Sequence, residues 1–592
     1  MQALNGPPIP ALAFCVGISG HRNLPAETTE AVRAQLTEAL REISIGVARV
    51  AEEHPHFYAE GPTRLSLLSQ LAAGADQMAA EAALKLGYGL RTVLPFSRES
   101  FARDFEGASR EQFDRLLSLS EQCWSLPGTR THADAAYAHA GEATAAQCDL
   151  LIAVWDGHHA RGLGGTADVV DYAVRRGVPV LHVPTDGSDA RILWSGFDRL
   201  PPVLFHRHDV PRRPMEQGLI DQLLRMLLLP AQDTDMLAEF LAEKERRWRL
   251  RPEFPLMMML AGVRKFTRQN LRSAPFFRST CDNWAPYRDG ALRIGQAERL
   301  EAAFAWADGL ADYFAQAYRS GIIFNFVAAS CAVVIGLAGF VMPDEKASLI
   351  AAELVLVALL ILNTSVGTRH QWHRRWLDYR FLAEQLRAMR FLKLFSLASP
   401  RSGAGNASWD RERWTQWYAG ALWRELGMPP SLADREALSH LAQEVARHDL
   451  DDQVAYNHVN EHRMHVLDHR LHRLGNLLFW ATAMIGAFML VSLLLHIGWV
   501  HDHIRYFSVA TAALPTIGSA LFGIRGALDF AAAAARSAST AHRLDQIAER
   551  LRQMPLGLSD AARAAEEASV TMQRDLGEWR SAYQHRVLAI PG

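Results

Sequence analysis

Residues 12–24, LAFCVGISGHRNL, determine how the first third of the chain is interpreted. The stretch begins as a continuous apolar run, which is typical of a strand buried inside a parallel sheet. It then ends in Gly-Ile-Ser-Gly, followed by His21 and Arg22. Glycines let the backbone approach a ligand closely, and basic side chains favour an anionic group. We therefore interpret this stretch as the first strand of an α/β domain and its phosphate-facing turn.

The residues after this stretch continue the same alternation of apolar runs and helical patterns. Strands are predicted at 12–19, 90–96, 148–157 and 178–184, helices at 25–53, 99–119 and 164–177, and a strand, a glycine turn and a helix within 63–87. This order predicts a doubly wound, Rossmann-like domain over residues 1–205. Such sheets bind ligands beyond the carboxyl ends of their strands.

Three predicted strand ends carry small residues, and they supply a candidate ligand site. Their backbone amides and helix N-termini suit a phosphate group. The candidate ligand-binding residues are Gly17, Ser19, Gly20, His21, Arg22, Gly74, Asp76, Asp156, Gly164, Gly165, Thr166 and Asp168. We assign no catalytic residue, metal ligand or cofactor. His465 and His469 have a helical spacing that could hold a metal, but no acidic or Cys partner accompanies them.

Four stretches in the rest of the chain are long and apolar enough to cross a bilayer, at 321–342, 347–366, 474–500 and 506–524. The connections within each pair are very short, whereas basic residues crowd the opposite ends. The positive-inside rule then places both chain termini in the cytoplasm.

The composition also indicates which membrane the spans cross. The abundance of Arg and Ala is typical of a GC-rich bacterial genome, so we expect a bacterial inner membrane.

An internal repeat supports the pairing of these spans. RFLAEQLRAM at 380–389 follows the first pair, and DQIAERLRQM at 545–554 follows the second. We expect a first hairpin over 311–396, a linker over 397–455 and a second hairpin over 456–592. One chain has too few spans to enclose a wide path, so a homo-oligomer is expected. Helices at 370–395 and 530–554 are its expected contacts.

The overall composition narrows the partner classes. The formal net charge of −2 argues against a dedicated nucleic-acid binder. The five cysteines show no spacing typical of zinc sites or disulfide frameworks.

We expect residues 206–310 to form a helical coupling region. Its stretch at 251–279 is both apolar and basic, which fits either the membrane surface or a solvated connection.

The ordered motifs GISGHR, LAAGADQMAAEAAL, VLPF, DLLIAVWDG and GGTADVVDYA resemble the SLOG superfamily over roughly residues 10–190. The paired spans resemble SLATT membrane modules. The resemblance implies a nucleotide-derived ligand and a membrane effector in bacterial defence or stress signalling, with pore formation as one way for it to act. The alternative is a membrane-anchored nucleoside or nucleotide hydrolase of the LOG type. However, Val169 stands where that motif has its catalytic Glu, and Asp168 lies one position early.

Overall fold

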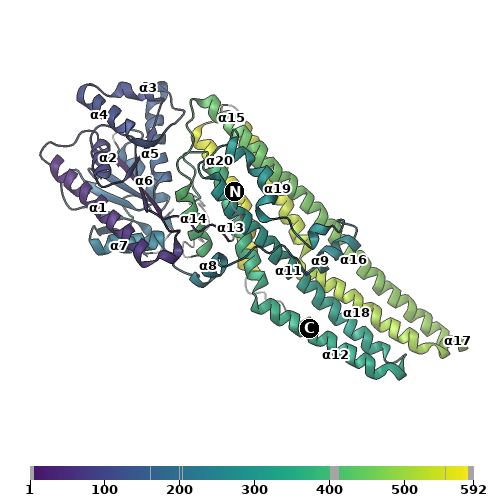
Figure 1. Cartoon of the computed structure of the whole chain (residues 1–592). Coiled ribbons are helices and arrows are strands. Elements are labelled where there is room, and N and C mark those ends of the chain that lie inside the picture. Colours follow the sequence, from purple (N-terminus) through teal and green to yellow (C-terminus); the bar gives the residue numbers. More distant parts are fainter. Residues whose placement is uncertain are drawn as a thin grey trace.

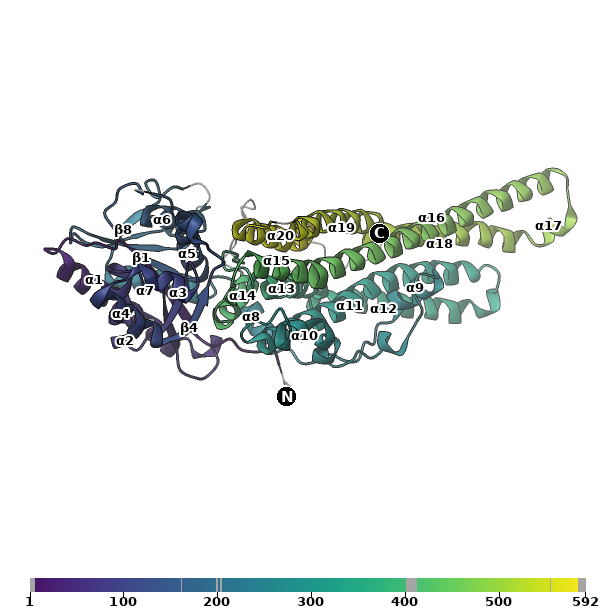
Figure 2. The same ribbon diagram turned by 90° about the horizontal axis from the view of Figure 1, so that it is seen from above.

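The computed structural model describes residues 6–160, 162–198, 201–202, 205–400, 413–553 and 555–583, without the side chains of 277, 279, 281 and 575–583. An α/β domain lies at one end of the molecule, and long helices extend away from it (Figure 1 and Figure 2). The predicted fold class, a Rossmann-like domain joined to an α-helical region with four possible membrane spans, is confirmed.

Among the described residues, eight strands form one sheet in the order β4-β3-β2-β1-β5-β6-β7-β8. The first six in this order are parallel, and β7 and β8 are antiparallel additions at one edge. Their bounds are β1 Ala13–Gly20, β2 Arg64–Ser69, β3 Gly89–Leu94, β4 Ser120–Ser125, β5 Leu150–Trp155, β6 Val180–Pro184, β7 Arg191–Leu193 and β8 Arg212–Pro214. The strand order reverses between β1 and β5, which makes this pair the topological switch point.

Helices cover the sheet because their apolar faces need a partner surface. On α1, residues such as Leu36, Leu40 and Val47 are fully buried. The helices are α1 Thr29–Glu53, α2 Ala75–Lys85, α3 Arg98–Phe101, α4 Gly107–Ser118, α5 Ala133–Gln147, α6 Thr166–Arg175, α7 Gln217–Leu228 and α8 Thr234–Leu241. Strand β4 and helix α5 were not predicted. Only Trp124 of β4 is buried, so this edge strand lacks an apolar run.

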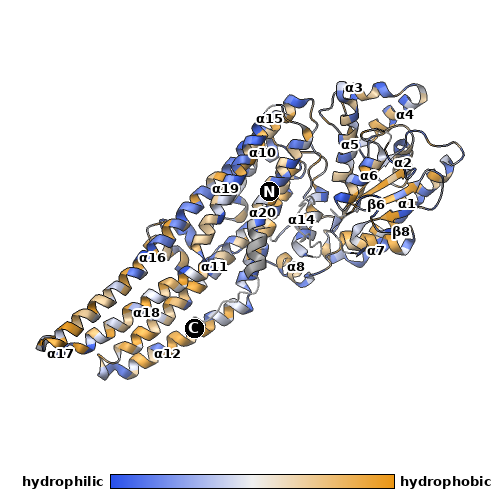
Figure 3. Cartoon of the chain, turned by 180° about the vertical axis from the view of Figure 1, so that it is seen from behind, coloured by the Kyte–Doolittle hydropathy of each residue, from blue (hydrophilic) through white to orange (hydrophobic). Residues whose placement is uncertain are grey.

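The remaining helices form the elongated half of the molecule. They are α9 Glu253–Leu260, α10 Cys281–Asp289, α11 Ala297–Ala338, α12 Lys346–Arg369, α13 Trp372–Leu392, α14 Trp414–Glu425, α15 Arg435–Val445, α16 Asp451–Leu494, α17 Gly498–Asp502, α18 Ile504–Leu528, α19 Phe530–Arg552 and α20 Leu558–Tyr583. Four of them contain stretches apolar enough to cross a membrane. Apolar residues dominate the outer parts of α16 and α18 (Figure 3), where Leu494 is 71% exposed.

The two predicted hairpins are built in the same way. In each, a long helix leads into the first span, and a helix after the second span packs back along it, as α13 does on α11 and α19 on α16. Both returning helices begin after one residue with left-handed backbone, Gln371 (φ 48°) and Asp529 (φ 48°). This shared geometry agrees with the duplication inferred from the repeat.

One span boundary differs from the sequence-based expectation. The third span ends at Leu494, because α17 forms a separate short helix at the tip. The returning helix α13 is buried within its own chain, with Leu382, Leu386 and Met389 fully enclosed. Its apolar face therefore packs within one chain, and a contact between copies through this helix stays a prediction.

Residues 397–455, expected as a linker, include α14 and α15, while its segment 401–412 lies outside the described residues. Tyr418 and Trp414 of α14 are buried against Phe240 of α8.

In the spans, the Asn363 amide donates to Asn325 Oδ1 over 2.7 Å. The polar side chains of the first hairpin thus join its two helices.

Candidate ligand site at the carboxyl edge of the sheet

The candidate site is centred on the switch point between β1 and β5. His21 directly follows β1, and Asp156 directly follows β5. The His21 backbone N–H donates to the Val154 carbonyl over 3.1 Å, and His21 Nε2 lies 3.8 Å from Asp156 Oδ1. The two side chains are 30% and 21% exposed, so both remain accessible from solvent. This is the crevice in which doubly wound sheets bind ligands.

The second predicted turn packs directly against the first. Gly74 has φ 86°, and a Cβ there would lie 2.2 Å from the Arg22 carbonyl oxygen. Only glycine allows this approach. Likewise, a Cβ on Gly20 would lie 2.5 Å from the Ala75 Cβ. The N-terminus of α2 is therefore held beside the turn after β1, and its partial positive charge adds to the site.

Arg22 extends over a group of residues that the sequence analysis missed. Its guanidinium carbon lies 5.0 Å from the centroid of the Tyr137 ring. The Tyr137 hydroxyl donates to Asp104, and Arg130 Nη1 lies 2.6 Å from Asp104 Oδ1. These residues come from loops after β3 and β4 and from α5. Because β4 and α5 were not recognised in the sequence, their residues could not be placed at this edge.

Asp76 is a buried carboxyl under the same turn. It is 3% exposed, and the Ser69 hydroxyl lies 3.4 Å from its Oδ2. Burial raises its pKa to about 7, against the lowering effects of hydrogen bonds from the backbone of Gln70 and Ala72 and of the charge on Arg22. The position suits a residue that orders the 69–75 loop more than one that touches a ligand.

The third predicted turn opens α6, which begins at Thr166. Gly164 has φ 83°, and its amide donates to Asp168 Oδ2 over 3.0 Å. Asp168 therefore caps its own turn. Val169 is buried, and its Cγ2 would lie 2.4 Å from a Cβ on Gly141 of α5. The Val169 side chain thus packs between α5 and α6. A carboxylate at position 169 would be buried among apolar side chains in place of the valine.

The other predicted residues lie near this edge or below it. Gly165 and Thr166 form the start of α6, with Thr166 buried. Ser19 is 7% exposed inside β1. Gly17 lies deeper in the strand, where a Cβ would meet Cys148 Sγ at 2.9 Å. The structure thus brings together His21, Arg22, Gly74 and Asp156, whereas Gly17 packs against α5.

Two helices that begin at this edge end on the elongated helical region. At the end of α5, the Gln147 amide donates to the carbonyls of Ser396 and Ala398 over 2.9 and 3.1 Å, and Lys393 donates to Gln147. At the end of α6, Arg176 Nη1 lies 2.7 Å from Glu566 of α20. Helix α5 therefore connects the candidate site to the segment after α13, and α6 connects it to α20.

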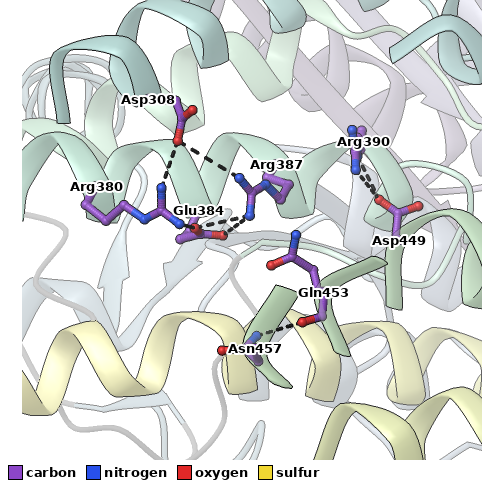
Figure 4. A network of polar contacts seen from close by, with 8 residues as sticks. All are labelled: Asp308, Arg380, Glu384, Arg387, Arg390, Asp449, Gln453 and Asn457. Atoms are coloured by element: carbon purple, nitrogen blue, oxygen red, sulfur yellow. Dashed lines mark hydrogen bonds and ion pairs between the residues drawn. The ribbon is translucent and has the colours of Figure 1, made fainter. Parts of the chain in front are cut away.

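Helix α13 also contributes to a polar network with α11 and with the segment before α16 (Figure 4). Arg380 donates to Asp308 over 2.8 Å and pairs with Glu384, which also accepts from Arg387. Arg390 pairs with Asp449 over 2.7 Å, and both side chains are buried. Arg380 and Glu384 also line a cavity of about 260 Å³ between the two hairpin units.

Among the described residues, no group of three or more His, Cys, Asp or Glu is arranged to hold a metal ion. The rings of His465 and His469 lie 6.3 Å apart.

In comparisons with known proteins, no protein-family model matches the chain and no curated protein matches it.

Proposed function

We propose that this chain is a membrane effector gated by a nucleotide-derived ligand, which binds at the carboxyl edge of the sheet, and that it acts as a homo-oligomer in bacterial defence or stress signalling. The observation that carries the proposal is the path of α5 and α6. Each begins at the candidate ligand site and ends in polar contacts with the segment after α13 or with α20, and these two helices pack on α11 and α19 of the hairpins.

The ligand class follows from the chemistry of the edge. The N-termini of α2, α5 and α6 point to it, and Arg22, Arg130 and His21 supply positive or protonatable groups. A phosphate could accept from these donors, and the partly buried Tyr137 ring could contact a base. A nucleotide derivative combines both features.

The hydrolase alternative has weaker support. LOG-type chemistry needs a carboxylate at the position of Val169, which is buried between α5 and α6. Asp168 is already the acceptor of the Gly164 amide. Ligand binding without turnover is therefore the expected behaviour of this site.

Ligand-dependent leakage from proteoliposomes tests the proposal. A panel of cyclic nucleotides, cyclic dinucleotides and ADP-ribose is first screened for binding to the purified chain. The ligand that binds should then change dye or ion release. Base release would favour the hydrolase, and tight binding without any change in leakage or oligomer size would remove the effector function.

Topology is the second part of the proposal, with both termini in the cytoplasm. Single cysteines at the tips, Asp344→Cys and Asp502→Cys, should react with an impermeant reagent outside intact cells. Ala433→Cys, in the loop between α14 and α15, should react only after lysis. Reaction of Ala433→Cys in intact cells would reverse the orientation.

A further inference from the structure

Residues 246–272, here called the collar segment, expose apolar and basic side chains together. Leu250 and Leu260 are 83% and 81% exposed. The other exposed apolar residues of the segment are Trp248, Leu256, Met259 and Leu271. Such a concentration of apolar side chains is costly in water and marks a surface that has a partner.

The collar segment has a defined structure. Its two ends run antiparallel, because the Arg249 N–H donates to the Leu271 carbonyl over 2.7 Å and the Ser273 N–H donates to the Arg247 carbonyl over 2.9 Å. The Arg272 guanidinium covers the Trp248 ring at 4.9 Å. Helix α9 lies between these two strand-like ends.

Contacts with the spans fix the level of the collar segment along the bundle. The Phe254 N–H donates to Ser320 Oγ over 3.0 Å, one residue before the predicted first span. Arg251 Nη1 donates to Asn363, near the end of the second span. Met258 packs with a cluster that includes Ile323, Leu471 and Ile524.

These contact points lie at the inner ends of all four spans. Helix α9 is accordingly seen against the side of the bundle, between the α/β domain and the outer tips (Figure 1). If the spans cross a bilayer, the collar segment lies at the boundary between its hydrocarbon and headgroups. Its exposed apolar residues then have a place to be buried without any second protein.

The charge of the segment agrees with this location. It contains eight basic residues and one acidic residue, Glu253, and Glu253 is already paired with Arg251 over 2.8 Å. Arg264, Lys265 and Arg268 are exposed directly after α9. Basic side chains beside exposed apolar ones are typical of segments that lie in the membrane interface.

We infer that the collar segment docks onto the anionic phospholipid headgroups of the bilayer that the spans cross. Leu256, Met259 and Leu260 enter the acyl boundary, and Arg264, Lys265 and Arg268 bind headgroup phosphates. The inference needs the four helices to be in a membrane but is independent of ligand binding and gating.

Photocrosslinking of the full chain identifies what covers the segment. In the test variant, benzoylphenylalanine replaces Leu260. In the matched control it replaces Leu163, a residue of the α/β domain whose side chain is 64% exposed. Both are reconstituted in vesicles of equal parts phosphatidylglycerol and phosphatidylcholine. We expect a phospholipid adduct at position 260 and none at 163. An adduct of the mass of a second chain, or equal lipid labelling at both positions, overturns the inference.

A charge variant tests the choice of headgroup. At position 260, adducts of phosphatidylglycerol should exceed those of phosphatidylcholine by about fivefold or more. A triple variant that combines Arg264→Gln, Lys265→Gln and Arg268→Gln should bring this ratio of adducts close to one. The control, Lys85→Gln, Arg103→Gln and Arg175→Gln, removes three exposed charges from the α/β domain and should leave the ratio unchanged. A ratio near one in the parent chain contradicts the role of anionic lipid.

Discussion

The two edges of the central sheet differ in how their charges are satisfied. At the amino edge, Asp149 accepts from the Cys15 N–H over 3.1 Å and from Arg424 of α14 over 2.9 Å. The side chains of Asp149 and Arg424 are 3% and 8% exposed. At the carboxyl edge, His21 and Asp156 lie 3.8 Å apart and stay partly open.

This difference separates a structural interface from a candidate site. A buried ion pair whose donors and acceptors are all used has no capacity left for a ligand, and its main effect is to fix one arrangement of the chain. Groups that are close but partly open can exchange water for a ligand. The charges of the amino edge therefore join the domains, whereas His21 and Asp156 at the carboxyl edge keep part of their surface accessible to solvent.

Arg424→Ala should give the largest effect, because it leaves Asp149 buried without its cationic partner. Removing one member of a buried pair costs about 3–5 kcal/mol. The first thermal transition of the purified protein should therefore fall by many degrees. Arg225→Ala is the matched control, since its pair with Glu53 is about 40% exposed on both sides and contributes little. Equal changes in the two variants would mean that the amino edge is not a structural interface.

Asp76 makes the stability of the carboxyl edge depend on pH. Its pKa is about 7 in the folded chain and near 3.8 when exposed, so the folded chain binds the proton more tightly. Its contribution to stability is present below pH 4 and is lost as the pH rises toward 7. The loss between pH 5 and 7 is on the order of 2–3 kcal/mol.

Thermal unfolding across pH 5–8 checks this dependence. The transition temperature of the parent protein should fall with rising pH more steeply than that of Asp76→Asn, which does not titrate. Asp186→Asn is a useful control, because the Asp186 carboxyl is at the surface and hydrogen bonds from Ser188 lower its pKa. Parallel curves for the parent and Asp76→Asn would exclude titration of Asp76 in this range.

Arg22→Ala addresses the ligand itself. A hydrogen bond to a charged group contributes about 1.5–3 kcal/mol, so affinity for the identified nucleotide ligand should fall tenfold or more. Arg33→Ala removes an arginine from α1 that pairs with Glu30 at the surface, and calorimetry should find its affinity unchanged. If Arg22→Ala binds as tightly as the parent, Arg22 does not belong to the site.

The sequence was informative where burial gives a strong pattern. β1 and β5 are continuous apolar runs, and their ends placed His21, Arg22 and Asp156 at one edge. β4 has one buried residue, Trp124, and so leaves no such pattern. The residues that it positions, including Arg130 and Tyr137, could not be found. Nor could a local pattern show that α13 is buried by α11 and α20, because that depends on contacts between distant segments.

Arg176→Ala should give the smallest energetic effect and the most specific one. Arg176 lies at the end of α6, where it pairs with Glu566 over 2.7 Å and donates to the Leu397 carbonyl over 3.3 Å. It is remote from His21 and Arg22, so ligand affinity should stay within about twofold of the parent. A ligand can shift an equilibrium only by its difference in affinity for the two states, and a tenfold preference corresponds to about 1.4 kcal/mol per chain. Loss of one contact that differs between the states should remove most of that preference.

Leakage from proteoliposomes at saturating ligand measures this loss. The Arg176→Ala variant should bind the ligand but release several-fold less dye than the parent. Arg175→Ala is the matched control, because this neighbouring arginine is exposed and should respond like the parent. If Arg176→Ala binds and responds normally, the contact with α20 does not carry the signal. The contacts of Gln147 at the end of α5 would then be the remaining connection between the open edge of the sheet and the spans.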